Sequence, residues 1–136
     1  FNSQHDVINR LAVARELLAR VAHPSCGLLL DAYHMERCGD GGRGFHAVAP
    51  REIFAFQFSD VPAGGPAPGR RPTDRLPPGR GRVRWLDVFR LLAEKGYTGY
   101  LSYEAPNPEQ WARPPLEVAR EAAEATRALL RTAASG

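Results

Sequence analysis

Short apolar segments alternate with amphipathic ones along this chain, and this alternation restricts the fold more than any other feature. Residues 26–31, 53–60 and 100–105 are short and rich in apolar, aromatic or β-branched side chains, as buried strands are. Segments with apolar residues at helical spacing lie between and around them. Strands that alternate with helices predict an α/β fold with a parallel sheet and right-handed crossover connections.

The helix boundaries are predicted from capping residues. We expect a first helix over about residues 6–21, capped by Ser3 or Asp6, and a second over about residues 85–95 that ends at Gly96. Pro114 and the proline that follows it open a last helix. The glycine-rich residues 38–44 and the Pro/Gly-rich residues 62–78 predict loops without regular structure.

Length and composition fit one globular domain or part of a larger one. The chain has 136 residues, of which 43% are hydrophobic and 24% charged. Because no apolar run approaches the length of a membrane span, we expect no membrane partner. Cys26 and Cys38 have no metal-ligand spacing and no disulfide framework, so they predict reduced thiols and a cytoplasmic location. The chain begins without Met or a secretory signal pattern, and we expect an upstream portion.

The positive charge is confined to one segment. Residues 61–84 contain six arginines and one acid, a local charge of +5, whereas the whole chain carries +3 and the remainder therefore −2. A basic footprint for nucleic acid extends over a face or a helix, so we expect no nucleic-acid partner. We expect residues 61–84 to form a long loop. This loop is either a solvated connector or a lid that holds an anion. Arg75 is the candidate for anion binding, because it precedes a Pro-Gly turn.

A polar side chain lies at or near the end of each predicted strand: Asp31, Gln57 and Glu104. In parallel α/β sheets and barrels the site forms at the carboxyl ends of the strands. Two carboxylates and an amide suit a hard divalent ion such as Mn²⁺ or Mg²⁺. The alternatives are that Asp31 is a turn residue and that Gln57 pairs with neighbouring backbone groups.

Four motifs, in order, resemble one family. LLLDAYHMER, FAFQFSDVP, LPPGRGRVRW and KGYTGYLSYEAPNP resemble the C-terminal half of the sugar-phosphate isomerase/epimerase family, the xylose-isomerase-like TIM barrels. The resemblance covers nearly all of residues 1–136. It implies that the chain is a partial barrel domain of about three β/α units from the C-terminal part of a (β/α)₈ TIM barrel.

The resemblance also implies site residues. Asp31 resembles the Asp of the family's LD-x-x-H strand, Glu104 the Glu of its S-x-E strand, and Gln57 stands where most members have His. These three would be metal ligands for Mn²⁺ or Mg²⁺, with Zn²⁺ or Co²⁺ as alternatives. His34 resembles the histidine that contacts substrate oxygens. The family's first glutamate ligand would lie upstream of Phe1, and Arg80 replaces its usual acidic or amide residue in the PG-x-G turn.

The implied chemistry is proton transfer next to a carbonyl of a small polyhydroxylated substrate. The family's divalent ion lowers the cost of removing the α proton, and an enediolate forms. Glu104 would be a catalytic acid/base as well as a ligand, His34 would stabilise charge on a substrate oxygen, and Arg75 would bind substrate. Without the resemblance, His34 reads as a surface or core-edge residue and Arg75 as part of a solvated connector.

The expected function is that of a divalent-metal-dependent isomerase or epimerase acting on a small sugar, sugar phosphate or inosose. One alternative is a 3-dehydroshikimate dehydratase-like lyase, because that lineage uses Gln at the position of Gln57 and its Q-x-x-D motif is matched here. A second is an inactive or interaction-only fragment, since strands of an incomplete barrel leave edges that favour a homo-oligomer. A nuclease for abasic DNA shares the barrel but needs more histidines.

Overall fold

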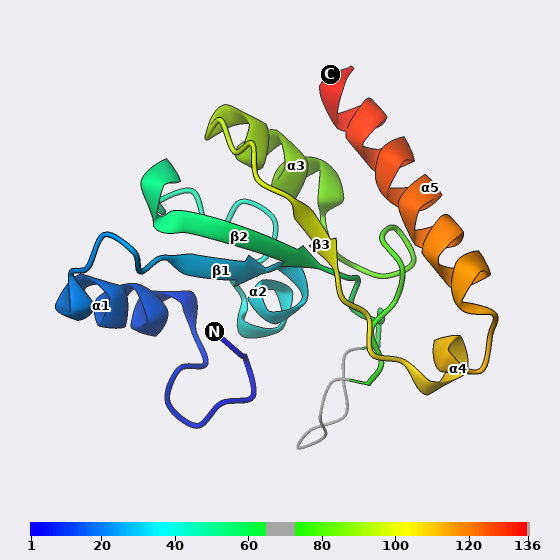
Figure 1. Cartoon of the computed structure of the whole chain (residues 1–136), viewed down its shortest axis with the longest axis horizontal. Helices are drawn as coiled ribbons and strands as arrows, with labels where there is room; N and C mark the ends of the chain where they lie inside the picture. Colours follow the sequence, from blue (N-terminus) through cyan, green and yellow to red (C-terminus); the bar gives the residue numbers. More distant parts are fainter. Residues whose placement is uncertain (65–72, 136) are drawn as a thin grey trace.

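The sheet predicted from the sequence is present. The computed structural model describes residues 1–64 and 73–135. Strands β1 (Leu28–Asp31), β2 (Ile53–Phe58) and β3 (Leu101–Tyr103) form a parallel sheet in the order β1-β2-β3 (Figure 1). Each strand is shorter by one or more residues than the segment predicted for it. The α/β class and the parallel topology are confirmed.

Helices connect and flank the strands. They are α1 (Leu11–Val21), α2 (Ala32–Cys38), the 3₁₀ turn η1 (Pro50–Glu52), α3 (Trp85–Glu94), α4 (Pro108–Trp111) and α5 (Pro115–Ala134). The predicted end of the second helix lies near Gly96, which adopts the left-handed conformation with φ of 65° just after α3. The short helix α4 was not predicted, because one turn carries too little periodicity. None of the described helices is long and apolar enough to cross a bilayer.

The predicted start of the first helix is wrong. Arg10, not Ser3 or Asp6, is the N-cap of α1 and has an extended backbone with φ of −135° and ψ of 151°. The preceding residues fold into turns in which the imidazole Nδ1 of His5 accepts hydrogen bonds from the N–H groups of Val7 and Ile8. These turns satisfy backbone donors that would otherwise favour another helical turn.

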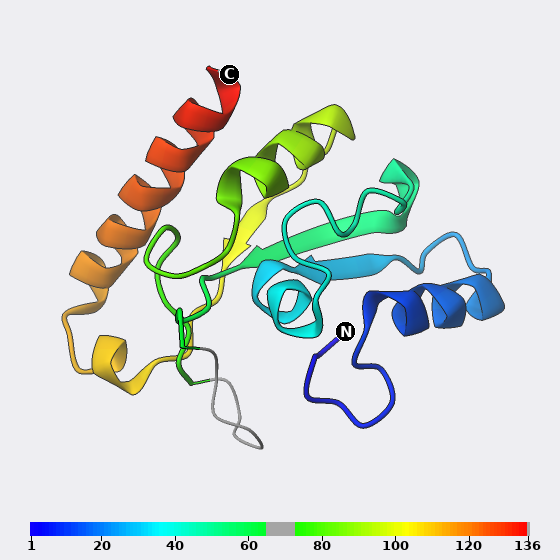
Figure 2. The same ribbon diagram turned by 180° about the vertical axis from the view of Figure 1, so that it is seen from behind.

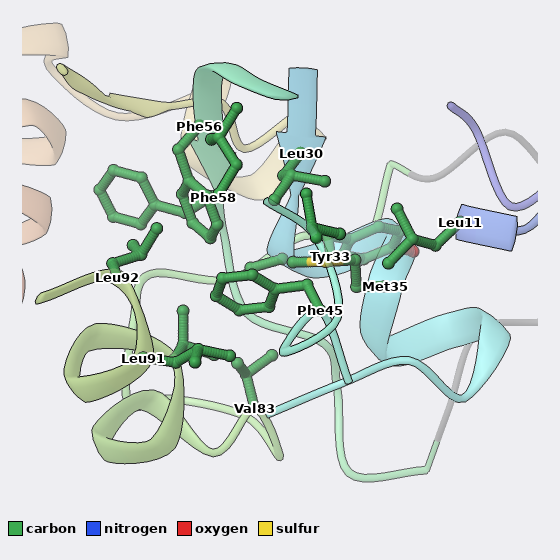
Figure 3. Close-up of a cluster of buried hydrophobic side chains, with 14 of the residues drawn as sticks. Leu11, Leu30, Tyr33, Met35, Phe45, Phe56, Phe58, Val83, Leu91 and Leu92 are labelled. Carbon is green, nitrogen blue, oxygen red and sulfur yellow. The ribbon is translucent and has the colours of Figure 1, made fainter. Parts of the chain in front are cut away.

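The core lies on one face of the sheet. Leu30, Phe56 and Phe58 point from the strands toward α3 and the segment after α2, where Phe45, Leu91 and Leu92 meet them (Figure 3). Leu30 and Phe56 are completely buried, and Phe58 is 2% exposed. Seen from behind, α2 and the segment after it lie in front of the sheet (Figure 2). Burial of these side chains fixes which face of each strand points inward.

The opposite face of the sheet holds the polar residues. The register pairs Leu29 with Ala55, Asp31 with Gln57, and Gln57 with Ser102, so alternate residues share this face. Leu29 is 42% exposed here, whereas its neighbour Leu30 is buried. The residues that were predicted as ligands on separate strands therefore lie at one end of this face.

The loop of residues 61–84 is more ordered than predicted where the structure describes it. Asp60 and Leu76 form an isolated antiparallel bridge. Three of its arginines are exposed and pair with nearby acids: Arg80 with Glu121, Arg82 with Glu36, and Arg84 with Asp87. This confirms the solvated reading for those three. Arg70 and Arg71 lie outside the described residues.

Candidate active site

Asp31 connects β1 to α2. It is the last residue of the strand and the N-cap of the helix, where its Oδ1 accepts a hydrogen bond of 2.9 Å from the N–H of Tyr33. The side chain is 2% exposed. Its Oδ2 accepts a hydrogen bond of 3.0 Å from Nη1 of Arg75. The apolar run of the sequence thus ends in a buried carboxylate that is both a helix cap and one half of an ion pair.

Arg75 lies at the centre of the site and is 3% exposed. Its Nη1 donates to Asp31, to Oγ of Ser59 at 3.2 Å and to the backbone oxygen of Glu104 at 3.1 Å. The carboxylate Oε2 of Glu104 lies 3.3 Å from the same nitrogen. The reading of Arg75 as part of a solvated connector is therefore wrong.

The rest of the guanidinium is also enclosed. Its Cζ lies 4.4 Å from the ring centroid of Tyr33, which places the cation over an aromatic face. The Tyr33 hydroxyl donates to Asp74 at 2.5 Å and accepts from Arg37 at 2.8 Å. Burial, followed by the bond to Asp74, raises the pKa of Tyr33 to about 12. Nε of Arg75 is buried and has no hydrogen-bond partner among the described residues.

His34 lies in the first turn of α2 and is 6% exposed. Its Nε2 is 3.1 Å from Nη2 of Arg75 and 3.8 Å from Oδ2 of Asp31. Burial lowers its pKa to about 4, and the attraction of Asp31 does not offset burial and the nearby positive charge of Arg75. The imidazole is therefore neutral at pH 7. Of the two alternatives for His34, a surface or a core-edge residue, the surface position is wrong, because the imidazole belongs to this buried network.

Gln57 and Glu104 complete the polar lining. A cavity of about 700 Å³ is lined by Asp31, His34, Gln57, Arg75 and Glu104, together with Phe1, Asn2, Gln4, Leu29, Thr73, Pro106 and Trp111. Glu104 follows β3, and its side chain is 47% exposed, in contrast to that of Asp31. All five residues predicted as site residues thus line one cavity at the carboxyl ends of the strands.

Asp60 holds the loop that carries Arg75, a role that was not predicted from the sequence. It is fully buried. Its Oδ1 accepts from the N–H groups of Val61 and Val83, and its Oδ2 from Gly79 N–H and Trp85 Nε1–H, all at 2.8–2.9 Å. Asp60 is the aspartate of the Q-x-x-D motif. Its position directly after a buried strand and before a Pro-Gly turn could have indicated that it anchors the loop.

Two further residues of the site were also missed. Oγ of Ser3 lies 3.0 Å from Nδ1 of His34. Nδ2 of Asn107 donates to the backbone oxygen of Arg75 at 3.0 Å, which ties the loop to the start of α4. Serine and asparagine are common in loops, and their partners lie 31 and 32 residues away, so spacing gave no signal.

The side-chain oxygens of Asp31, Gln57 and Glu104 are of the kind that binds a small cation, and they line the same cavity. Oδ2 of Asp31 and Oε2 of Glu104 lie 3.0 and 3.3 Å from the same positively charged nitrogen, and Gln57 supplies an amide on the strand between them. Two carboxylates and an amide suit a hard divalent ion. Among the described residues no three His, Cys, Asp or Glu side chains form a metal-binding group.

Parallel strands with a polar cavity at their carboxyl ends occur in α/β barrels, and comparisons with known proteins assign this chain to such a fold. The sequence profile of the xylose isomerase-like TIM barrel family matches residues 2–129. The chain belongs to this family, as the resemblance of its motifs predicted. The predicted partial barrel is confirmed, because the chain matches solved structures of this fold and covers less than half of each.

Three similar proteins illustrate the match. An inosose isomerase of Halalkalibacterium halodurans is 27% identical over 119 residues, which are 88% of this chain and 42% of that protein. The crystal structure of the IOLI protein with a bound zinc atom matches with a TM-score of 0.81 and 23% identity, over 92% of this chain and 45% of that one. The structure of D-psicose 3-epimerase with D-tagatose from Clostridium cellulolyticum H10 matches with a TM-score of 0.69 and 19% identity. The match covers 96% of this chain and 47% of that one.

Proposed function

We propose that this chain is the C-terminal part of a divalent-metal-dependent isomerase or epimerase that acts on a small sugar, sugar phosphate or inosose. One observation carries the proposal: Asp31, Gln57 and Glu104 follow one another across three adjacent parallel strands and line the same cavity. The inosose isomerase relative supports a polyhydroxylated carbonyl substrate. The neighbour with bound zinc supports a divalent ion in this family.

The metal would be held by Asp31, Gln57 and Glu104, with Mn²⁺ or Mg²⁺ as the expected ion. When bound, such an ion polarises the substrate carbonyl and so acidifies the neighbouring C–H. Glu104 is exposed enough to take that proton, and its backbone is fixed because its N–H donates to Phe58 at 3.1 Å. The proton returned to the other carbon completes an isomerisation, and its return to the opposite face completes an epimerisation.

His34 and Arg75 would hold the substrate oxygens. The guanidinium of Arg75 carries the positive charge that the developing enediolate needs, and the neutral imidazole of His34 lies beside it, with Nε2 3.1 Å from Nη2 of Arg75. Burial of both groups strengthens these interactions, because water does not screen them. Arg75 shares Asp31 and Glu104 with the proposed metal, so this arginine balances the two carboxylates when no divalent ion is bound.

A titration of the 136-residue chain with Mn²⁺ tests the proposed metal site. We expect its melting temperature to rise with Mn²⁺ concentration according to RT ln(1 + [L]/Kd), and the Asp31→Asn variant to show no rise. Asp87→Asn, in the first turn of α3 with its side chain 39% exposed, is the matched control and should respond like the parent. Equal responses of the parent and Asp31→Asn would place the metal elsewhere.

Exchange of the substrate α proton tests the proposed chemistry directly. With Mn²⁺ in D₂O, we expect deuterium to enter an inosose or a ketose at the carbon next to the carbonyl, and Glu104→Gln to abolish this incorporation. Because the chain spans less than half of its relatives, the same assay belongs on a protein that includes the upstream half of the barrel. Metal binding without deuterium incorporation in that longer protein would reject the isomerase proposal.

A dehydratase is the second candidate, because Gln57 stands where most family members are expected to have His. Such a lyase forms the same enolate and then expels a β-hydroxyl as water. The deuterium assay separates the two candidates when 3-dehydroshikimate is included: loss of water from it, without exchange into sugars, would favour the lyase.

A further inference from the structure

Both ring nitrogens of His34 face hydrogen-bond donors. Nη2 of Arg75 lies 3.1 Å from Nε2, and a guanidinium can donate but never accept. A proton on Nε2 would point at this positive charge. Nε2 therefore carries the lone pair, and in a neutral imidazole the single proton must then lie on Nδ1.

A proton on Nδ1 needs an acceptor, and Ser3 supplies one. Its Oγ lies 3.0 Å from Nδ1, at hydrogen-bond distance. The backbone N–H of the same residue also points at Nδ1 from 3.3 Å and by itself would favour the opposite tautomer. The bond from the charged Arg75 is the stronger of the two competing interactions, because a charge-assisted hydrogen bond is about twice as strong as a neutral one.

We propose that Ser3 is a positioning residue that fixes His34 in the Nδ1–H tautomer, so that Nε2 holds the Arg75 guanidinium against Asp31. The chain of contacts runs from Ser3 through His34 to Arg75 and ends at Asp31, on β1. Loss of the hydroxyl would leave the backbone N–H as the nearest group to Nδ1. The imidazole would then favour a proton on Nε2, directed at Arg75.

The tautomer can be measured without metal or substrate, so this proposal stands or falls separately from the proposed function. The experiment records two-bond ¹H–¹⁵N correlations of the histidine rings in the ¹⁵N-labelled 136-residue chain at pH 7.5 with EDTA. For His34 we expect the pattern of a protonated Nδ1. His5, whose Nδ1 accepts from Val7 and Ile8 N–H, provides an internal example of the opposite tautomer.

The variants Ser3→Ala and Ser3→Thr form a matched pair. Threonine keeps the hydroxyl and should keep the parent pattern. Alanine removes one hydrogen bond, and we expect the ratio of the Nδ1–H to the Nε2–H form to fall about fivefold or more. A merely structural role for Ser3 would change stability but leave this ratio unchanged.

Three results would overturn the proposal: a parent His34 with its proton on Nε2, a Ser3→Ala spectrum with the parent ratio, or a Ser3→Thr spectrum with the opposite tautomer. If Ser3→Ala does not fold, Ser3→Cys replaces it, because sulfur is a weaker acceptor of similar size. The ratio for Ser3→Cys should then lie below that of the parent.

Discussion

Nη1 of Arg75 lies 3.0 Å from Oδ2 of Asp31, and the two side chains are 3% and 2% exposed. The pair joins a loop to the end of β1 across 44 residues of sequence. A buried charge is tolerated in a folded protein when it has a partner of opposite charge. Without that partner, its lost hydration is not compensated and the fold is destabilised.

Replacement of Arg75 by Met should destabilise the chain by about 3–5 kcal/mol, because it leaves Asp31 buried without its counter-charge. Urea unfolding followed by fluorescence measures the change in the free energy of unfolding. Arg80→Met is the control, since Arg80 is 68% exposed and its ion pair with Glu121 is long at 3.6 Å. Its effect should stay within about 0.5 kcal/mol, and a similar loss in both variants would contradict the role of the buried pair.

Replacement of Asp60 by Asn should cost about 1–3 kcal/mol, because the amide NH₂ would face N–H groups that the carboxylate now accepts from. The emission of Trp85 should change as well, since its Nε1–H loses a buried acceptor at 2.8 Å. Asp6→Asn, at an exposed position, provides the control. Unchanged stability and emission in Asp60→Asn would show that the loop is held by other contacts.

The stability of the metal-free chain should depend on the protonation of His34. Burial lowers its folded pKa to about 4 from an ordinary value of 6.5, so the unfolded chain binds more protons between these values. Stability should therefore rise with pH from about 4 to about 6.5, and this residue should contribute no slope above that window. The contribution is up to about 3 kcal/mol, from the conversion of one pKa unit into 1.36 kcal/mol.

Two variants separate the contribution of His34 to the pH dependence of stability from the contribution of the carboxylates. Urea unfolding at pH 4.5 and 7.5, in EDTA, is compared for the parent, His34→Gln and His46→Gln. His46 is exposed. His34→Gln should have the smaller difference between the two pH values, and His46→Gln should match the parent. Equal differences in all three would show that His34 titrates normally.

Gln57 should tune the choice of metal, if the proposed site is correct. Gln57→Leu removes one of the oxygen ligands and should weaken Mn²⁺ binding by about tenfold or more, measured by calorimetry. Gln57→His supplies an imidazole and should move the preference from Mn²⁺ toward Zn²⁺. A Gln57→Leu variant with parental Mn²⁺ affinity would remove this residue from the ligand set.

The sequence by itself determined the alternation of helices and strands, the parallel sheet and the placement of three candidate ligands at the ends of its strands. Apolar runs fix which residues are strands, and the carboxyl ends of parallel strands necessarily meet at one edge, so Asp31, Gln57 and Glu104 could be predicted together. The start of α1 could not be predicted. Residues 2–8 form local turns instead of helix, although their sequence has the apolar spacing and the capping residues of a helix start.

The tertiary structure alone decided the burial and the contacts of Arg75, His34 and Ser3. Arg75 stands in a Pro/Gly/Arg-rich segment that reads as solvated, yet it is 3% exposed. The reason is physical: its charge is compensated by Asp31 and Glu104, and its backbone is held by Asn107, all brought close by folding. The neutral state of His34 likewise depends on burial, which no local pattern of residues records.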